Sequence, residues 1–331
     1  MIASIVDTAR ELADELLFPT AIETDAADLV PQSHLDAFAG RGLYGLTGPT
    51  DCGGLGADFP TACAVVETLA SGCLTTTFVW AQHLGPVWLL SASKDAALRE
   101  RWLPRLCSGD VRAGIALSAF RADRPHVRAE RVEGGWMFDG VAQWVTGWGR
   151  NDILLTSALS SDRRLVRALV DGAACATLSA RRLHLVGANA SATVELTFER
   201  HFVPAERVVT DESYIAPPAY DGGGRFNGSL SLGVARRCCA LIGPSPLDAE
   251  LVARRNQLDA ATDETMAQAR AAATELALRA AGALSVATGS RSLLREHHAQ
   301  RLVREATFLL TFGTRPAIRA GLLERLGASS E

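Results

Sequence analysis

Residues 136–148, WMFDGVAQWVTGW, predict a β-hairpin in the middle of the chain. Apolar and aromatic residues occupy 136–138, Asp139-Gly140 is a typical turn dipeptide, and an extended pattern resumes over 143–146. An aromatic residue in a strand usually packs into a core, and that is the ordinary interpretation of Trp144. The functional interpretation is that the Trp144 indole stacks beside a flat cofactor while the Thr146 hydroxyl contacts the same cofactor.

The pattern on either side of this stretch predicts an α+β protein in three parts. Residues 1–112 read as a helical domain, 113–218 as a middle β domain of barrel or sandwich type, and 225–331 as a C-terminal helix bundle. The expected helices cover 34–42, 61–72, 74–90, 96–106, 226–241, 248–282, 295–312 and 316–326. The expected strands cover 115–117, 136–138, 143–146, 153–155, 164–170 and 192–198, and Pro204 is expected to fix an exit loop.

Composition narrows the class of protein. The 331 residues carry a net charge of −4, with Lys94 as the only lysine, so no basic field suits the chain to nucleic acid. The first residues lack a basic segment and a long apolar run, and no apolar run is long enough for a membrane span, so we expect a cytoplasmic protein. The seven cysteines are an odd number without a C-x-x-C pair, which indicates free, mostly buried thiols and no metal site.

Five stretches resemble motifs of the acyl-CoA dehydrogenase family, in the same order and over nearly the whole chain. GLYGLTGPTDCGGLGAD (42–58) and RWLPRLCSGDVRAGIALS (101–118) are similar to the family's glycine-rich turn and to its approach to the β domain. QWVTGW (143–148) is similar to its Lys-x-Trp-Ile-Thr-Asn strand. ELTFERHFVPAERVV (195–209) is similar to its exit strand, and REATFLLTFGTRPAIR (304–319) to its helix ending in Tyr-Glu-Gly-Thr.

The resemblance implies an FAD cofactor whose isoalloxazine ring lies against the β domain. Trp144 and Val145 would lie beside the ring, and the Thr146 hydroxyl would face the flavin N5 edge. The backbone around Leu117 and the Ser118 hydroxyl would contact the pyrimidine side. The implied reaction belongs to lipid metabolism: a base removes the α proton of an acyl-CoA thioester while the β hydride passes to the flavin, which an electron-transfer acceptor then reoxidises.

The chain departs from the family at the catalytic base. The family's glutamate follows the aromatic residue of the last motif, whereas Phe312 is followed here by Gly313, which cannot accept a proton. Other members carry the glutamate on the first bundle helix, but the matching GGGRFNGSLS (222–231) has no carboxylate, and Asp221 lies upstream. The catalytic residue is therefore unassigned. His83, in a predicted buried helix, is interpreted as a core histidine rather than as a catalyst.

Two further departures concern the cofactor and the subunit contact. LSAFRADRPHVRAE (117–130) replaces the family's Thr-Glu-Pro-x-x-Gly-Ser-Asp loop, so Ser118 remains without the other cofactor-holding residues. LSVATGSRS (284–292) replaces a glycine-rich stretch that reaches the FAD of a neighbouring subunit. Arg291 would contact a pyrophosphate there or be an ordinary surface arginine. The bundle is also shorter than in typical members at this contact.

These features leave three hypotheses open. In the first, the chain is a base-less FAD-dependent acyl-CoA dehydrogenase subunit of a homo- or hetero-oligomer whose partner supplies the base. In the second, a homomeric flavin enzyme performs altered oxidation or hydroxylation chemistry, with Asp123, His126 or Glu305 as its base. Asp123 and His126 also fit solvated loop residues, and Glu305 fits an ion pair with Arg301. In the third, the chain is a flavin-free scaffold.

Overall fold

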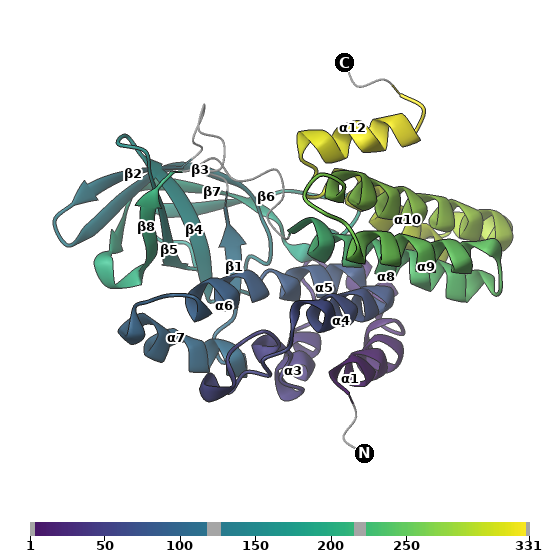
Figure 1. Ribbon diagram of the computed structural model, residues 1–331, viewed down its shortest axis with the longest axis horizontal. Helices are drawn as coiled ribbons and strands as arrows, with labels where there is room; N and C mark the ends of the chain where they lie inside the picture. Colours follow the sequence, from purple (N-terminus) through teal and green to yellow (C-terminus); the bar gives the residue numbers. More distant parts are fainter. Residues whose placement is uncertain (1–3, 118–126, 215–222, 329–331) are drawn as a thin grey trace.

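The computed structural model describes residues 4–117, 127–214 and 223–328, which fold into helices, a sheet and a second set of helices (Figure 1). This arrangement confirms the predicted α+β class. The first helices are α1 (Ile5–Glu11), a π-helical turn (Leu12–Leu17), α2 (Ala21–Ala26), α3 (Gln32–Gly40), α4 (Phe59–Gly72), α5 (Leu74–Ala81), α6 (Leu84–Ser91) and α7 (Ala96–Ser108). The last are α8 (Gly223–Ile242), α9 (Pro246–Asp259), α10 (Met266–Thr288), α11 (His298–Thr311) and α12 (Pro316–Arg325).

Local chemistry explains where two of the long predicted helices divide. The helix expected over 74–90 is two helices, because Pro86 has no N–H to donate to the carbonyl of Gln82 one turn earlier. The helix expected over 248–282 is also wrong as a single element, since α9 ends at Asp259. There the Thr265 side-chain oxygen accepts a hydrogen bond from the Thr262 N–H at 2.9 Å and holds a turn before α10.

The middle of the chain forms an eight-stranded sheet with the strand order β6-β7-β3-β2-β4-β5-β8, and β1 pairs parallel with β4. The strands are β1 (Ala113–Ala116), β2 (Val127–Val132), β3 (Gly135–Val145), β4 (Ile153–Ser160), β5 (Arg164–Asp171), β6 (Leu178–Arg182), β7 (Val194–Pro204) and β8 (Val208–Ser213). Strands β2, β6 and β8 were not predicted from the sequence, and β8 replaces part of the expected exit loop.

The hairpin predicted within 136–148 is wrong. Asp139 and Gly140 lie inside the single long strand β3, where they pair with β2, and β3 also pairs antiparallel with β7. The register against β7 shifts between Phe138 and Gly140, so the Asp-Gly signal marks an irregularity in a strand instead of a turn. The true hairpin turn is Glu133-Gly134, where Gly134 has a φ of 78°.

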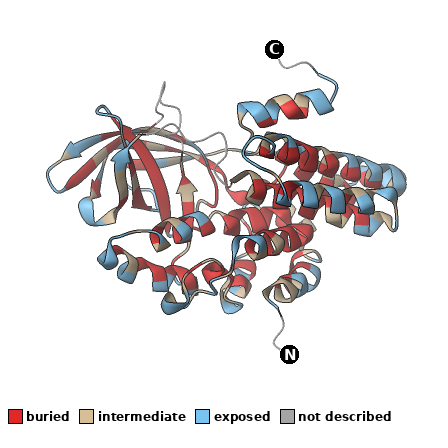
Figure 2. Ribbon diagram, viewed as in Figure 1, coloured by how far each residue is buried: buried red, intermediate tan, exposed pale blue. Residues whose placement is uncertain are grey.

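Two large apolar cores hold the molecule together (Figure 2). The first is shared by the N-terminal helices and the C-terminal bundle, and α4 packs directly against α8 within it. The second lies inside the sheet, and a smaller cluster joins the sheet to α6 and α7. The two sets of helices therefore act as one packed layer beside the sheet.

A polar contact ties this layer to the sheet. Arg304 of α11 forms a two-pronged ion pair with Asp25 of α2 and donates a hydrogen bond of 3.1 Å to the carbonyl of Val186, between β6 and β7. Among the helices within the described ranges, none has the length and hydropathy needed to cross a membrane.

Candidate functional site

Trp144 is displayed by a bulge near the end of β3. Ala142 pairs with Leu196 and Val145 with Val194, so β3 has one more residue than β7 across this interval. The Trp144 backbone takes the left-handed conformation with φ 60°, and its side chain is 64% exposed. A bulge re-aims side chains and is common beside active sites, and a non-glycine residue in this conformation carries backbone strain. Trp144 is therefore not a core residue.

Val145 and Thr146 turn inward immediately after the bulge. Val145 is fully buried and Thr146 is 3% exposed. The Thr146 hydroxyl lies 3.3 Å from that of Thr193, which lies 2.8 Å from the Ser191 hydroxyl. These three buried hydroxyls form a hydrogen-bonded chain directly behind the exposed indole, and the Thr146 hydroxyl points into it.

Backbone strain gathers around this chain. Ala188 and Ala192, which bracket the short 3₁₀ turn Asn189–Ser191, have φ values of 58° and 48°. Trp144, Ala188 and Ala192 are three of the five non-glycine residues with positive φ in the described part of the chain. The turn is fixed from outside, because the Val30 N–H donates to the Ala190 carbonyl at 2.9 Å. Strain persists only where the surroundings impose it, and it concentrates at functional sites.

Leu117 follows β1, and β1 is in contact with β3. Its side chain is half-buried against the cluster that joins the sheet to α6 and α7. Between β1 and the end of β3 lies the Asn151 amide, which donates to the Thr146 carbonyl at 2.9 Å. A β-carbon on Gly114 or Gly147 would come within 2.2 or 2.5 Å of the Asn151 nitrogen, so both positions require glycine.

Three residues of this site were not predicted from the sequence: Asn151, Ser191 and Thr193. The one usable signal was the pair of glycines, Gly114 and Gly147, that leave room for the Asn151 amide. The two hydroxyl residues carry no pattern of their own, since they approach Thr146 only through the pairing of β3 with β7.

Gly313 follows α11 with a φ of 61° and is exposed. A β-carbon there would lie 3.2 Å from the Asn227 side-chain nitrogen on α8. The left-handed backbone also suits the glycine of a Gly-Thr pair, and aligning Gly313-Thr314 in that way would put Phe312 in the glutamate's position. Phe312 stacks on Phe308 at 5.7 Å and meets the edge of Phe78 at 4.7 Å. Neither alignment provides a carboxylate.

Glu305 forms a buried ion pair with Arg301 one turn earlier on α11. The Arg301 Nη1 donates to the Glu305 carboxylate at 2.5 Å, and each side chain is 1% exposed. Burial raises the pKa of the Glu305 carboxyl, and the adjacent guanidinium opposes that rise. The structure confirms the ion-pair interpretation, which leaves this carboxylate sealed away from a substrate.

The remaining candidates divide into two groups. Arg291 is an exposed residue at the end of the α10 region. Four predicted site residues lie outside the described residues: Ser118, Asp123, His126 and Asp221.

Five of the seven cysteines are buried and all are free, as predicted. Within the three described ranges, no cluster of His, Cys, Asp or Glu side chains has the size and spacing to hold a metal ion.

Comparisons with known proteins agree on one group. The family model "Acyl-CoA dehydrogenase, N-terminal domain" matches residues 3–110. The mitochondrial isovaleryl-CoA dehydrogenase of Arabidopsis thaliana is 27% identical over 218 residues, covering 62% of this chain and 53% of that protein. The human short-chain specific acyl-CoA dehydrogenase is 25% identical over 248 residues, covering 70% and 59%. The chain thus spans little more than half the length of these relatives.

Solved structures extend the similarity of fold to nearly the whole chain. The butyryl-CoA dehydrogenase of Megasphaera elsdenii superposes with a TM-score of 0.82 at 18% identity, covering 99% of this chain and 98% of that one. A dibenzothiophene monooxygenase of Paenibacillus sp. A11-2 superposes with a TM-score of 0.78 at 20% identity, covering 97% of each chain. One fold therefore accommodates two different named activities, and the chemistry has to be argued from the site.

Proposed function

Because the chain belongs to the acyl-CoA dehydrogenase family, we propose that it is an FAD-binding subunit of an acyl-CoA dehydrogenase-type enzyme. Its substrate would be an acyl-CoA or another acyl thioester, and its reaction α,β-desaturation in lipid metabolism in the cytoplasm. One observation carries the proposal. Trp144 lies on the strand that the resemblance assigns to the flavin, and a strained bulge holds its indole exposed instead of packing it.

The residues around the bulge fit a flat aromatic cofactor in part. The exposed Trp144 indole offers an apolar face for stacking, Val145 closes the wall behind it, and half-buried Leu117 ends the neighbouring β1. The Thr146 hydroxyl is bonded to Thr193, so it would reach a flavin edge only by exchanging that hydrogen bond. When bound, the flavin would supply the hydride acceptor.

The proton acceptor would come from a partner subunit. Gly313 and Phe312 have no carboxylate, and the Glu305 carboxylate is engaged by Arg301 inside α11. A general base has to lie within hydrogen-bonding distance of the proton that it removes. We therefore favour a hetero-oligomer with a complete subunit of the same family that supplies the base. An electron-transfer acceptor would then reoxidise the reduced flavin.

The end of the bundle supports such a partner. Val286 is 83% exposed and Leu293 80%, and Leu294 beside them is also exposed. They lie in or next to residues 284–292, which replace the family's subunit-contact motif. Large exposed apolar side chains that gather in one place mark protein contacts more often than solvated surface.

Trp144→Ala should weaken flavin binding about tenfold, because the stacking face and its buried area are lost. The measurement is the ratio of flavin to protein, taken from the fluorescence of the supernatant after denaturation. It should be made on the chain co-purified with a candidate partner, and on both proteins apart.

Trp88→Ala is the matched control. Trp88 on α6 is 69% exposed, close to the exposure of Trp144, but it has ordinary helical geometry. Its removal should leave the flavin ratio unchanged. Equal flavin ratios in the two variants would remove Trp144 from the cofactor site.

The flavin-loaded chain alone should fail to reduce its flavin when it is mixed anaerobically with an acyl-CoA. Adding the partner should raise the rate of flavin bleaching at least about 100-fold, which is the usual contribution of a positioned general base. Stopped-flow absorbance of the flavin band measures both rates. Rapid bleaching without a partner would contradict the missing base and support the homomeric alternative, while a flavin-free complex would support the scaffold.

A further inference from the structure

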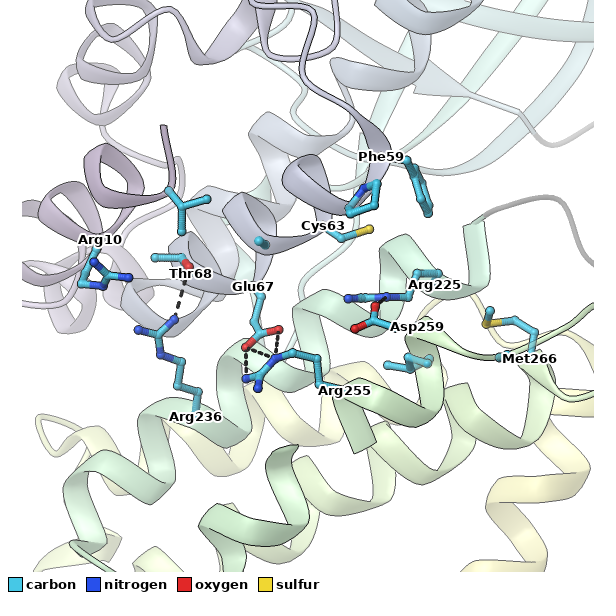
Figure 3. Close-up of a pocket in the computed structure, with 15 residues that line it drawn as sticks. Arg10, Phe59, Cys63, Glu67, Thr68, Arg225, Arg236, Arg255, Asp259 and Met266 are labelled. Atoms are coloured by element: carbon cyan, nitrogen blue, oxygen red, sulfur yellow. Dashed lines mark hydrogen bonds and ion pairs between the residues drawn. The ribbon is translucent and has the colours of Figure 1, made fainter. Parts of the chain in front are cut away.

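A separate cavity lies beside α8, the first helix of the C-terminal bundle. A cavity of about 500 Å³ opens between α4 and α8, with α1, α9 and the start of α10 at its edges (Figure 3). Its volume lies within the usual range of small-molecule sites. The cavity is lined by both charged and apolar side chains, so a ligand there would be recognised by its charge and its apolar surface as well as by its shape.

This cavity is separate from the proposed flavin site. Asn227 of α8 approaches Gly313, whereas Arg225 lines the cavity and Ser229 faces Cys63 in the cavity wall. Residues two apart on a helix project about 200° from one another. Arg236 returns to the cavity side and lines it with Arg225. No lining residue belongs to the β domain around Trp144, so binding in this cavity would not require a flavin there.

Positive charge exceeds negative charge along the lining, which has four arginines and two carboxylates. Two of the arginines are satisfied within the cavity wall. Arg225 donates to the Asp259 carboxylate at 2.7 Å. The Nε and Nη2 atoms of Arg255 both donate to the buried Glu67 carboxylate. Arg10 pairs with Asp7 outside the lining.

Arg236 is the cation without a counter-ion. Its guanidinium is half-buried and donates one hydrogen bond of 3.2 Å to the Thr68 hydroxyl. It forms no ion pair of its own within the described ranges, because the nearby Glu67 pairs with Arg255 and Asp14 pairs with Arg237. Burial lowers the pKa of Arg236, and the charges of Glu67 and Asp14 oppose that fall. A guanidinium has five N–H donors, so several remain for an oxyanion.

The other end of the cavity combines apolar side chains with the Arg225–Asp259 ion pair. Phe59, Leu258 and Met266 line it, and Figure 3 shows Phe59 and Met266 at the end away from Arg236. The neutralised Glu67–Arg255 pair lies between the two ends. The cavity thus differs along its length, with a guanidinium that lacks an ion pair at one end and apolar side chains beside a neutralised ion pair at the other.

We propose that this cavity binds a small amphipathic organic anion. Its carboxylate or phosphate head would pair with Arg236, and its apolar body would pack against Phe59, Leu258 and Met266. An arginine suits either head group, because its fork of donors matches two oxygens of a carboxylate or a phosphate.

Isothermal titration calorimetry with four probes tests the proposal: octanoate, octyl phosphate, inorganic phosphate and octanol. The protein is used as purified, with its partner where one is needed for solubility. At least one of the two amphipathic anions should bind at least about tenfold more tightly than inorganic phosphate or octanol, because each of those lacks one half of the recognition. The stronger of the two anions identifies the head group.

Three variants locate the binding. Arg236→Gln should weaken it at least about tenfold, and Ala64→Phe, which fills the cavity and keeps every arginine, should abolish it. Arg254→Gln is the control, since Arg254 on α9 pairs with Glu250 and lies outside the lining. Absence of binding, or equal binding in Arg236→Gln, overturns the proposal. The flavin ratio measured on the same samples tests the proposed function separately.

Discussion

Glu305→Ala should lower the free energy of unfolding by about 3–5 kcal/mol, because it leaves the Arg301 guanidinium charged and buried without its partner. Both side chains are 1% exposed and lie one turn apart on α11, in the core shared by the two helical regions. Water cannot replace the lost carboxylate there. Urea denaturation at pH 7, followed by far-ultraviolet circular dichroism, measures the change.

Two controls separate burial from charge. Arg254→Ala breaks the pair with Glu250, whose side chains are 27% and 26% exposed, and should cost about 0.5 kcal/mol or less. The double variant Arg301→Met/Glu305→Leu removes both charges and should recover most of the loss. If Glu305→Ala costs no more than Arg254→Ala, the pair is solvated and Glu305 becomes available again as a base.

Elements with strong local signals were predictable from the sequence. The α4 and α7 helices begin at capping aspartates, Asp58 and Asp95, which accept hydrogen bonds from the Thr61 and Leu98 N–H groups. Both helices were predicted within two residues of their observed starts, and the caps explain why they begin there. The change from helical to strand periodicity and back predicted the three-part α+β architecture, and the five family motifs agreed with it.

The middle strands were less predictable because their pairing is not local. Asp139-Gly140 has the chemistry of a hairpin turn, yet β3 runs through it since β2 and β7 pair with it on both sides. In β2 the buried positions are Val127 and the small Ala129, between the exposed Arg128 and Glu130, so the strand carries little apolar signal. A charged, half-exposed strand looks like a loop until its partners are known.

The candidate sites show the same limit. Sequence singled out Trp144, but the left-handed backbone that exposes its indole depends on one extra residue opposite β7. The inward direction of the Thr146 hydroxyl depends on Thr193, 47 positions away. The arginine cavity went unpredicted for a similar reason, since Arg236 meets Thr68 across 168 positions. When the residues of a site come from distant segments, they form no motif of fixed spacing that could be found in the sequence.

His83 is a buried, neutral histidine that joins the helices to the sheet. The Ala113 N–H donates to its Nδ1 at 2.9 Å, so its other nitrogen carries the proton and donates to the Leu106 carbonyl at 3.1 Å. Ala113 begins β1, the strand that leads to Leu117. His83 is 1% exposed with both ring nitrogens hydrogen-bonded, which confirms the core interpretation, and burial lowers its pKa to about 3.

The protein should therefore lose stability as the pH falls below about 6.5, the ordinary histidine pKa. The folded His83 has the lower pKa, so the unfolded chain binds the proton first, and the stability present above pH 6.5 declines toward pH 3. One such group contributes at most about 1.4 kcal/mol per pH unit, or about 2 kcal/mol between pH 6.5 and 5. Urea midpoints measured in steps across that window, where few carboxylates titrate, report the slope.

His83→Gln isolates this group. The glutamine amide can donate to Leu106 and accept from Ala113 without titrating, so the variant should lose most of the slope between pH 6.5 and 5. His298→Gln tests the other strongly shifted histidine, because burial lowers the pKa of His298 to about 4 where it stacks on Phe18. A wild-type slope that survives in His83→Gln but vanishes in His298→Gln would move the acid-sensitive contact from β1 to the start of α11.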